Sequence, residues 1–369
     1  ATNHQTSLIP RTAGTSLAGQ CVGDGIIVDV SKYFTEIISV DQQNKTVTLQ
    51  PGVIRDELNN ELKPFGLFFG PNTSTSSRCM MGGMVGNNSS GTTSIQYGVT
   101  RDKVLEIKTI LSNGDEANFK SLNKEEFEEK KKLNSLEGTI YNSIYNELKS
   151  EAAQLEIINN FPKPEIHRRN TGYALDELIK TQVFSDSEKP INLASLLCGS
   201  EGTLAFTTEI TLQLDNLPPQ HTAMVVSHYS SLKNCLNDVS MVMNHNLHTC
   251  EMMDDIILDC TKKNTTYNEY RKFVEGAPKA LLLLEVKSDT KDDLEKQVYE
   301  LLISLKTSKL SYAYPTLKGD EINNALELRK AGLGLLGNMV GDRKAVACIE
   351  DTAVSLIDLP NYINQICYY

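Results

Sequence analysis

Apolar and polar residues alternate along several stretches of the chain, which predicts β-strands. The clearest case is residues 206–214, where positions 206, 208, 210, 212 and 214 form one face and the residues between them the other. Residues 40–50 predict a hairpin with Asn44-Lys45 near its turn, and residues 103–119 predict a second one that turns at Asn113-Gly114. The apolar run in residues 21–31 predicts a turn that leads into a buried strand.

Helical patterns separate these strands. Residues 54–66 predict a short amphipathic helix closed by Pro64 and Gly66, and residues 121–161 are helical and charged. The segment "DNLPPQ" at 215–220 is the best linker in the chain. Beyond it, strands at 222–229 and 279–288 alternate with helices at 231–246 and 290–307. This order predicts a smaller α+β domain with helices on one face of an antiparallel sheet.

Composition narrows the functional classes. The 369 residues are 40% hydrophobic and 22% charged, and the net charge of −11 disfavours a nucleic-acid partner. No apolar run reaches membrane-spanning length, and no signal peptide opens the chain. The eight cysteines are scattered without any Cys-x-x-Cys, which argues against a metal site or a disulfide framework. We therefore expect a cytoplasmic, reducing environment.

A glycine- and hydroxyl-rich loop, "PRTAGTSLAGQ", spans residues 10–20. It lacks the Lys of a Walker A loop after Gly19, and it lacks the Gly-x-Gly-x-x-Gly spacing of a dinucleotide fingerprint. Gly14 and Gly19 tolerate positive φ, so the backbone amides could form an anion-binding nest. An ordinary glycine turn explains the same residues equally well, and the loop alone leaves both interpretations open.

The stretch that decides the class is residues 71–98, with five glycines, ten Ser or Thr and Arg78 as its only charge. A loop of this length without periodicity is either disordered or functional. Interleaved Met, Val and Ile disfavour a flexible linker. A segment that coats a long polar ligand would satisfy its many backbone groups, and we favour that interpretation.

Four motifs in order resemble the FAD-linked oxidase family, which includes glycolate oxidase subunits, D-lactate dehydrogenases and D-2-hydroxyglutarate dehydrogenases. They are "PRTAGTSLAGQ", the segment that ends in "GNNSSGTTSIQYG", "RRNTGYALDEL" and "CGSEGTLAFTTEITLQL". A later segment, "LRKAGLGLLGNMVGDRKAVACIEDTAV", resembles the branch of long bacterial proteins in which this module precedes an iron–sulfur region.

The resemblance implies an α+β fold with two domains. A vanillyl-alcohol-oxidase/PCMH-type FAD-binding domain would occupy residues 1–218, with its N-terminal part missing. A smaller α+β, ferredoxin-like substrate cap domain would occupy residues 219–369, with its C-terminal part missing.

The resemblance also implies a set of cofactor-binding residues. Those around the pyrophosphate would be Gly14, Thr15, Ser16 and Leu17. The rest of FAD would be lined by Pro71, Thr75, Gly82, Gly83, Asn87, Asn88, Gly91 and Tyr97, with Glu201, Gly202 and Ile210 along the ribityl and adenine side. Ser90 stands where the family often has a first glycine. Thr15 matches the position of a covalent flavin histidine in some relatives, so the FAD is expected to be non-covalent.

For catalysis, Arg329 matches a substrate-binding arginine, and a guanidinium suits a carboxylate because its fork bonds both oxygens. An exposed helix arginine is the alternative. A family threonine one turn further on matches Leu333 here. The implied activity is oxidation of a small D-2-hydroxy acid (D-lactate, glycolate or D-2-hydroxyglutarate) by hydride transfer to FAD. A non-catalytic flavin-binding module is the alternative, and a nicotinamide-dependent flavin reductase ranks last.

Other residues are open to two interpretations. Arg169, Asn170 and Tyr173 would either border the flavin or form a helix-entry turn. The cluster of His245, His248, Cys250 and Glu251 fits the start of a strand in the second domain better than a metal site, so no metal is expected here. A divalent metal and an iron–sulfur cluster would belong to parts outside this chain. The expected partner is the hydroxy acid. The sequence does not identify the electron acceptor. It leaves open whether the protein is a homodimer and whether it lies peripherally at the inner membrane.

Overall fold

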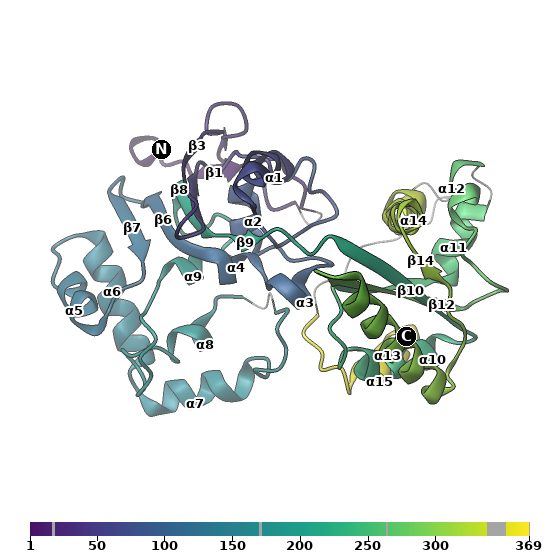
Figure 1. Cartoon of the computed structure of the whole chain (residues 1–369). Coiled ribbons are helices and arrows are strands. Elements are labelled where there is room, and N and C mark those ends of the chain that lie inside the picture. Colours follow the sequence, from purple (N-terminus) through teal and green to yellow (C-terminus); the bar gives the residue numbers. More distant parts are fainter. Residues whose placement is uncertain (17–18, 170–171, 263–264, 338–351, 369) are drawn as a thin grey trace. The chain divides into compact units, whose positions relative to one another are not determined.

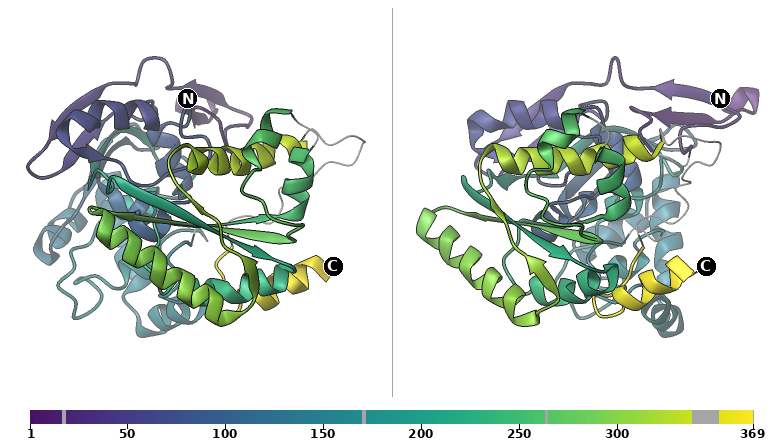
Figure 2. Two further views of the ribbon diagram at one scale, coloured as in Figure 1. Left: turned by 45° about the vertical axis from the view of Figure 1, so that its right-hand side comes forward. Right: turned by 90° about the vertical axis from the view of Figure 1, so that its right-hand side faces the viewer.

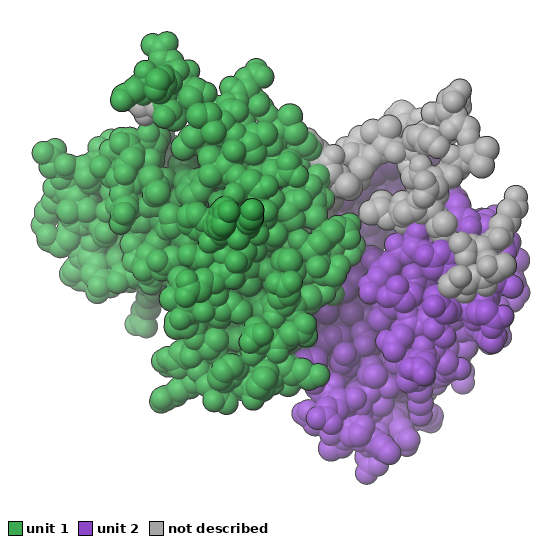
Figure 3. Space-filling model, turned by 90° about the horizontal axis from the view of Figure 1, so that it is seen from above, with its two compact units in different colours: residues 1–91, 97–217 green, residues 92–96, 218–369 purple. Residues whose placement is uncertain are grey.

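The computed structural model describes residues 1–16, 19–169, 172–262, 265–337 and 352–368. These residues form two compact units (Figure 3). Unit 1 contains residues 1–91 and 97–217, and unit 2 contains residues 92–96 and 218–369. The chain passes from unit 1 to unit 2 at Leu217–Pro218, inside the linker segment.

Unit 1 is built on a five-stranded antiparallel sheet in the order β3-β4-β8-β6-β7 (Figure 1). Its strands are β3 (Ile37–Asp41), β4 (Thr46–Leu49), β6 (Val104–Ile110), β7 (Glu116–Lys120) and β8 (Phe206–Gln213). Both predicted hairpins are confirmed, with Lys45 and Gly114 at positive φ in their turns. β8 lies between β4 and β6, so it joins segments far apart in the sequence.

Short helices surround this sheet. The helix predicted at 54–66 is confirmed as α1 (Arg55–Leu62) and the 3₁₀ turn η2 (Lys63–Phe65), and Gly66 ends it in a left-handed conformation. The charged region forms α5 (Lys124–Lys131), α6 (Leu136–Leu148) and α7 (Glu151–Asn160). The remaining elements are η1 (Thr2–His4), α4 (Thr100–Lys103), α8 (Leu175–Leu178), α9 (Ala194–Leu197), and the paired β5 (Leu67–Phe68) and β9 (Asp215–Asn216).

Two sequence predictions for the first 98 residues need correction. The strand predicted to be buried is β2 (Ile26–Asp29), where Ile26 and Ile27 are 52% and 46% exposed. It pairs only with β1 (Leu8–Arg11), so among the described residues no larger sheet covers it. The region 71–98 is also less loop-like than expected, because it contains α2 (Met81–Asn87) and α3 (Ser94–Tyr97). Met81, Met84 and Val85 of α2 enter the core.

Unit 2 is built on the antiparallel sheet β11-β12-β10-β13, with β14 also paired to β10. Its strands are β10 (His221–Tyr229), β11 (Thr249–Asp254), β12 (Ala280–Ser288), β13 (Ser311–Ala313) and β14 (Thr316–Leu317). Its helices are α10 (Leu232–Val242), α11 (Asp255–Lys262), α12 (Thr265–Tyr270), α13 (Lys291–Ser308), α14 (Asp320–Gly337) and α15 (Leu359–Tyr368).

The prediction that helices cover one face of this sheet is wrong, because they cover both (Figure 2). Ala223 and Val225 of β10 pack with α10 and α13, whereas Met224 and Val226 pack with α11 and α14. The continuous apolar runs in β10 and β12 are the physical reason, since a strand buried on both faces loses the alternation of a half-exposed one.

Candidate functional site

Three glycine-bearing segments of unit 1 meet at close range. A Cβ on Gly83 of α2 would lie 2.5 Å from Oγ1 of Thr12, and a Cβ on Gly202 would lie 2.7 Å from Cγ of Pro10. Gly202 also has φ of +73°, which disfavours any L side chain. The end of β1 therefore packs on the turn at residues 199–202, and the loop after β1 packs on α2. Both contacts are close enough to disfavour a side chain at the glycine.

Backbone hydrogen bonds join α2 to the same turn. The amide of Gly199 donates to Val85 O at 3.0 Å, and the amide of Glu201 donates to Gly86 O at 2.9 Å. Glu201 is a non-glycine residue at φ of +52°, and burial raises the pKa of its carboxyl group. The turn thus has a strained backbone fixed by its neighbours, which is common at ligand sites.

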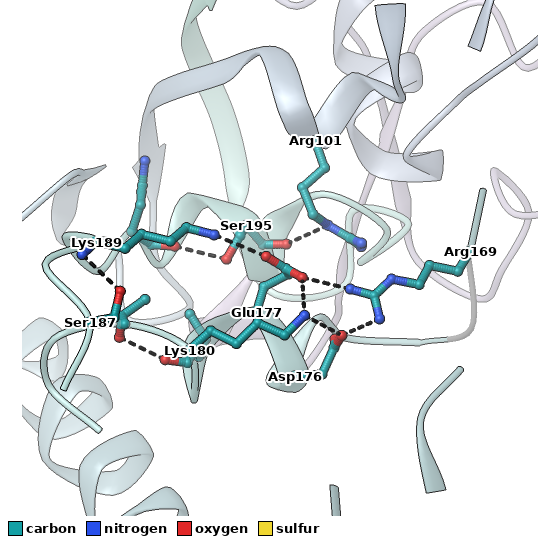
Figure 4. Close-up of polar contacts among 11 residues, drawn as sticks. Arg101, Arg169, Asp176, Glu177, Lys180, Ser187, Lys189 and Ser195 are labelled. Carbon is teal, nitrogen blue, oxygen red and sulfur yellow. Dashed lines mark hydrogen bonds and ion pairs between the residues drawn. The ribbon is translucent and has the colours of Figure 1, made fainter. Parts of the chain in front are cut away.

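Asn88 and Arg101 brace the end of α2. Asn88 is fully buried, caps α2 in a left-handed conformation, and accepts a hydrogen bond from the Arg101 amide at 2.9 Å. The Arg101 guanidinium donates to Ser195 O at 3.2 Å, drawn in Figure 4, and to Cys198 O at 2.7 Å. Burial lowers the pKa of Arg101. One side chain therefore ties α4 to the segment that leads into the 199–202 turn.

The segment from Pro71 to Gly91 folds back on itself. A Cβ on Gly91 would lie 1.9 Å from Asn72 O, so only glycine fits there. Pro71 O accepts from Arg55 Nε at 3.2 Å, and the Thr75 hydroxyl lies 3.3 Å from that of Thr73. Tyr97 packs edge-on against Phe68, with ring centroids 5.0 Å apart.

Ser90 carries an unsatisfied polar atom in this segment. Its Oγ is buried, and no hydrogen-bond partner lies within reach in the part of the chain that the structure describes. Buried hydroxyls normally have a hydrogen-bond partner, and a ligand bound at this site would supply one to Ser90. Together with the glycine contacts, this orphaned donor fits a long polar cofactor such as FAD.

The structure describes all but one of the other residues expected around FAD. Gly14 has φ of +65° beside the Arg11 guanidinium, as an anion nest requires, with Thr15 and Ser16 next to it. Gly82 packs on Pro51, and the Asn87 amide donates to Ser89 Oγ at 3.0 Å. Leu17 lies outside the described residues. Ile210 is fully buried in the sheet core, paired with Leu49 and Ile107.

Arg169 belongs to an ion-pair network in unit 1 (Figure 4). Its guanidinium forms ion pairs with Asp176 and, at 2.6 Å, with Glu177. Glu177 also forms ion pairs with Lys180 at 2.8 Å and with Lys189 at 2.9 Å. Burial alone would raise the pKa of Glu177, but the two lysines lower it to about 2. Tyr173 lies 3.5 Å from the Thr203 hydroxyl, and Asn170 is outside the described residues.

In unit 2, Arg329 is neither freely exposed nor isolated. It lies on α14, and its Nη2 forms an ion pair with Oε2 of Glu251 on β11. The Arg329 side chain is 32% exposed and that of Glu251 16%. Leu333 belongs to α14, but its side chain is not among those described.

The polar cluster around His245 is dispersed. His245 Nε2 lies 3.0 Å from Ser304 Oγ. Burial of His248, together with the positive charge of nearby Lys287, lowers the pKa of the His248 imidazole to about 4. Burial raises the pKa of Cys250 to about 12. Within the described ranges no three His, Cys, Asp or Glu side chains are placed to bind a metal, and no described helix is long and apolar enough to cross a membrane.

Sequence reasoning missed Arg101 and the partner of Arg329. Arg101 is the first charged residue after Arg78 and lies three positions beyond the motif that ends in Tyr97-Gly98, which is the available sequence signal for it. The pairing of Glu251 with Arg329 spans 78 positions (329 − 251) and two different elements, so local pattern could not reveal it.

Family profiles match two parts of the chain. The profile described as "FAD binding domain" matches residues 1–120, and "FAD linked oxidases, C-terminal domain" matches residues 218–367. The D-2-hydroxyglutarate dehydrogenase of Escherichia coli K12 is 33% identical over 99% of this chain and 36% of its own length. That of Pantoea ananatis is 32% identical over 96% of this chain and 35% of its own length. The chain thus spans about a third of these relatives.

A solved structure shares the fold. Alkyldihydroxyacetonephosphate synthase superposes with a TM-score of 0.59 at 14% identity, over 91% of this chain and 55% of that one. At this identity the likeness concerns architecture alone.

Proposed function

Because the chain belongs to the FAD-linked oxidase family, we propose that it carries the FAD-binding and substrate-binding parts of a dehydrogenase for small D-2-hydroxy acids. The observation that carries the proposal is the meeting of Thr12 with Gly83 and of Pro10 with Gly202, which brings three family motifs to one place.

Residues of unit 1 would bind FAD without a covalent bond. The amides and hydroxyls of residues 14–16 would face the pyrophosphate, because a positive-φ glycine turns successive N–H groups toward an anion. The buried Ser90 hydroxyl would gain a partner in the cofactor. Asn88 and Arg101 would keep the end of α2 and the 199–202 turn in place. Bound FAD would supply the hydride acceptor.

Residues of unit 2 would bind the substrate. Arg329 would bond the substrate carboxylate through its fork, which fixes the α-carbon for hydride removal. In domain terms, residues 1–218 would bind FAD and residues 219–369 would bind the hydroxy acid. A cytoplasmic location is part of the proposal, supported by the scattered cysteines, and cell fractionation tests it.

Dye-linked turnover of the full-length protein tests this function. D-Lactate, glycolate and D-2-hydroxyglutarate are offered with an artificial electron acceptor, each chiral acid beside its L enantiomer. Turnover with a D acid, and at least tenfold less with its enantiomer, is expected. Absence of turnover with all of them, in protein that contains FAD, contradicts the proposal.

The Glu251–Arg329 ion pair favours a second candidate, a non-catalytic flavin-binding module. In that case the pair is purely structural, and Arg329 needs no substrate. The module would bind FAD, and no hydroxy acid would reduce it.

A further inference from the structure

We propose that Glu251 is a positioning residue that orients the guanidinium of Arg329 toward the substrate carboxylate. The inference rests on the proposed function and adds to it a residue outside the expected site. Its basis is the ion pair between Glu251 Oε2 and Arg329 Nη2 in unit 2.

Glu251 is fixed by the sheet. Its backbone pairs with Leu283 of β12, a strand buried along nearly its whole length. Successive strand residues point to opposite faces. Cys250 packs with the α10–α13 side, whereas Met253, on the same face as Glu251, packs with the α14 side. The carboxylate is therefore presented from a rigid strand toward α14.

Arg329 needs such a partner. Ala325 and Leu328 anchor α14 in the core, and Arg329 follows one turn after Ala325 on the same side. Its long side chain has many rotamers, and ordering it for a substrate carries an entropic cost. The ion pair selects one orientation before the substrate arrives. A guanidinium has five N–H donors, so one carboxylate leaves donors for a second.

The burial of Glu251 argues that this residue orients Arg329 and does not merely mimic the substrate carboxylate. A carboxylate that merely occupied the substrate position would have to leave when substrate binds. The Glu251 side chain is only 16% exposed, so moving its carboxylate away from Arg329 would leave a largely buried charge without its partner. We therefore expect both carboxylates to share Arg329.

The test compares Glu251→Gln with wild-type full-length holoenzyme in the dye-linked assay. Glutamine keeps the shape and loses the charge. Because Arg329 would hold the carboxylate in both ground and transition states, KM should rise about tenfold while kcat changes less than about threefold. The matched control is Glu327→Gln, which removes an exposed glutamate paired with Lys330 at 2.8 Å on the same helix and should leave KM unchanged.

Stability is measured on the same samples, because losing a half-buried ion pair also lowers Tm. If Glu251→Gln does not fold, Glu251→Asp keeps the charge but withdraws it by one methylene, and an intermediate rise in KM is expected. An unchanged KM in a folded variant, or a lower KM from relieved competition, overturns the proposal. A wild-type enzyme that no hydroxy acid reduces overturns the proposed function first, and the inference with it.

Discussion

The hydroxyl of Thr12 occupies the space that a side chain at position 83 would need. An ideal Cβ on Gly83 would come within 2.5 Å of Thr12 Oγ1, well inside van der Waals contact. Through this contact the loop after β1 packs against α2. The contact thus joins the glycine-rich loop to the hydroxyl-rich segment across 71 positions of sequence (83 − 12), from Thr12 to Gly83.

Gly83→Ala should disrupt that contact. The new methyl group must displace the Thr12 hydroxyl, whose loop carries residues 14–16, so we expect FAD affinity to fall at least tenfold and Tm to drop. Gly86→Ala is the control on the same helix, because its Cβ would meet neighbours only at 3.6 Å or more. Helix propensity favours that change by up to about 1 kcal/mol. Equal FAD affinities of the two variants would contradict the proposed packing role.

Ser90→Ala should act in opposite directions without and with cofactor. In the apo-protein the change removes a buried hydroxyl that has no partner in the described part of the chain, so Tm should stay or rise. With FAD it removes a donor, and Kd should rise about five- to tenfold. Flavin fluorescence titration gives Kd, and thermal melting gives both Tm values. A Kd equal to that of wild type would mean that Ser90 does not contact the cofactor.

Glu177 should contribute a pH-dependent stability to unit 1. Its folded pKa of about 2 lies below the ordinary value of 4.5, so the stabilisation is complete above pH 4.5 and lost as pH falls toward 2. Glu177→Gln should therefore lower stability at pH 7 by on the order of 1 kcal/mol, and the difference from wild type should shrink below pH 4.5. Glu129→Gln, at an exposed pair with Lys132, is the control and should show little effect. A difference that is constant from pH 7 to pH 3 would argue against this ion-pair account.

The local elements were largely predictable from the sequence because their signals are local. Asn113-Gly114 and Asn44-Lys45 mark turns, Pro64-Gly66 ends a helix, and alternation identifies β8. The exposure of Ile26 and the double coverage of β10 were not predictable in the same way. Both depend on which other elements pack against a strand. An apolar run in the sequence looks the same whether other elements cover that strand or leave it exposed.

The candidate site was predictable only as a set of motifs. Gly83 and Gly202 were expected from the family resemblance, but their contacts with Thr12 and Pro10 join three distant segments. The bonds of Arg101 to two carbonyls and the partner of Arg329 are also non-local. Such contacts are set by the tertiary fold.

The most direct measurement is the absorption spectrum of the full-length protein reconstituted with FAD, recorded anaerobically before and after addition of each D-2-hydroxy acid. We expect the oxidised flavin band to bleach with at least one D acid and to persist with its L enantiomer. A protein that binds FAD but whose band no hydroxy acid bleaches would contradict the dehydrogenase assignment and favour the non-catalytic module.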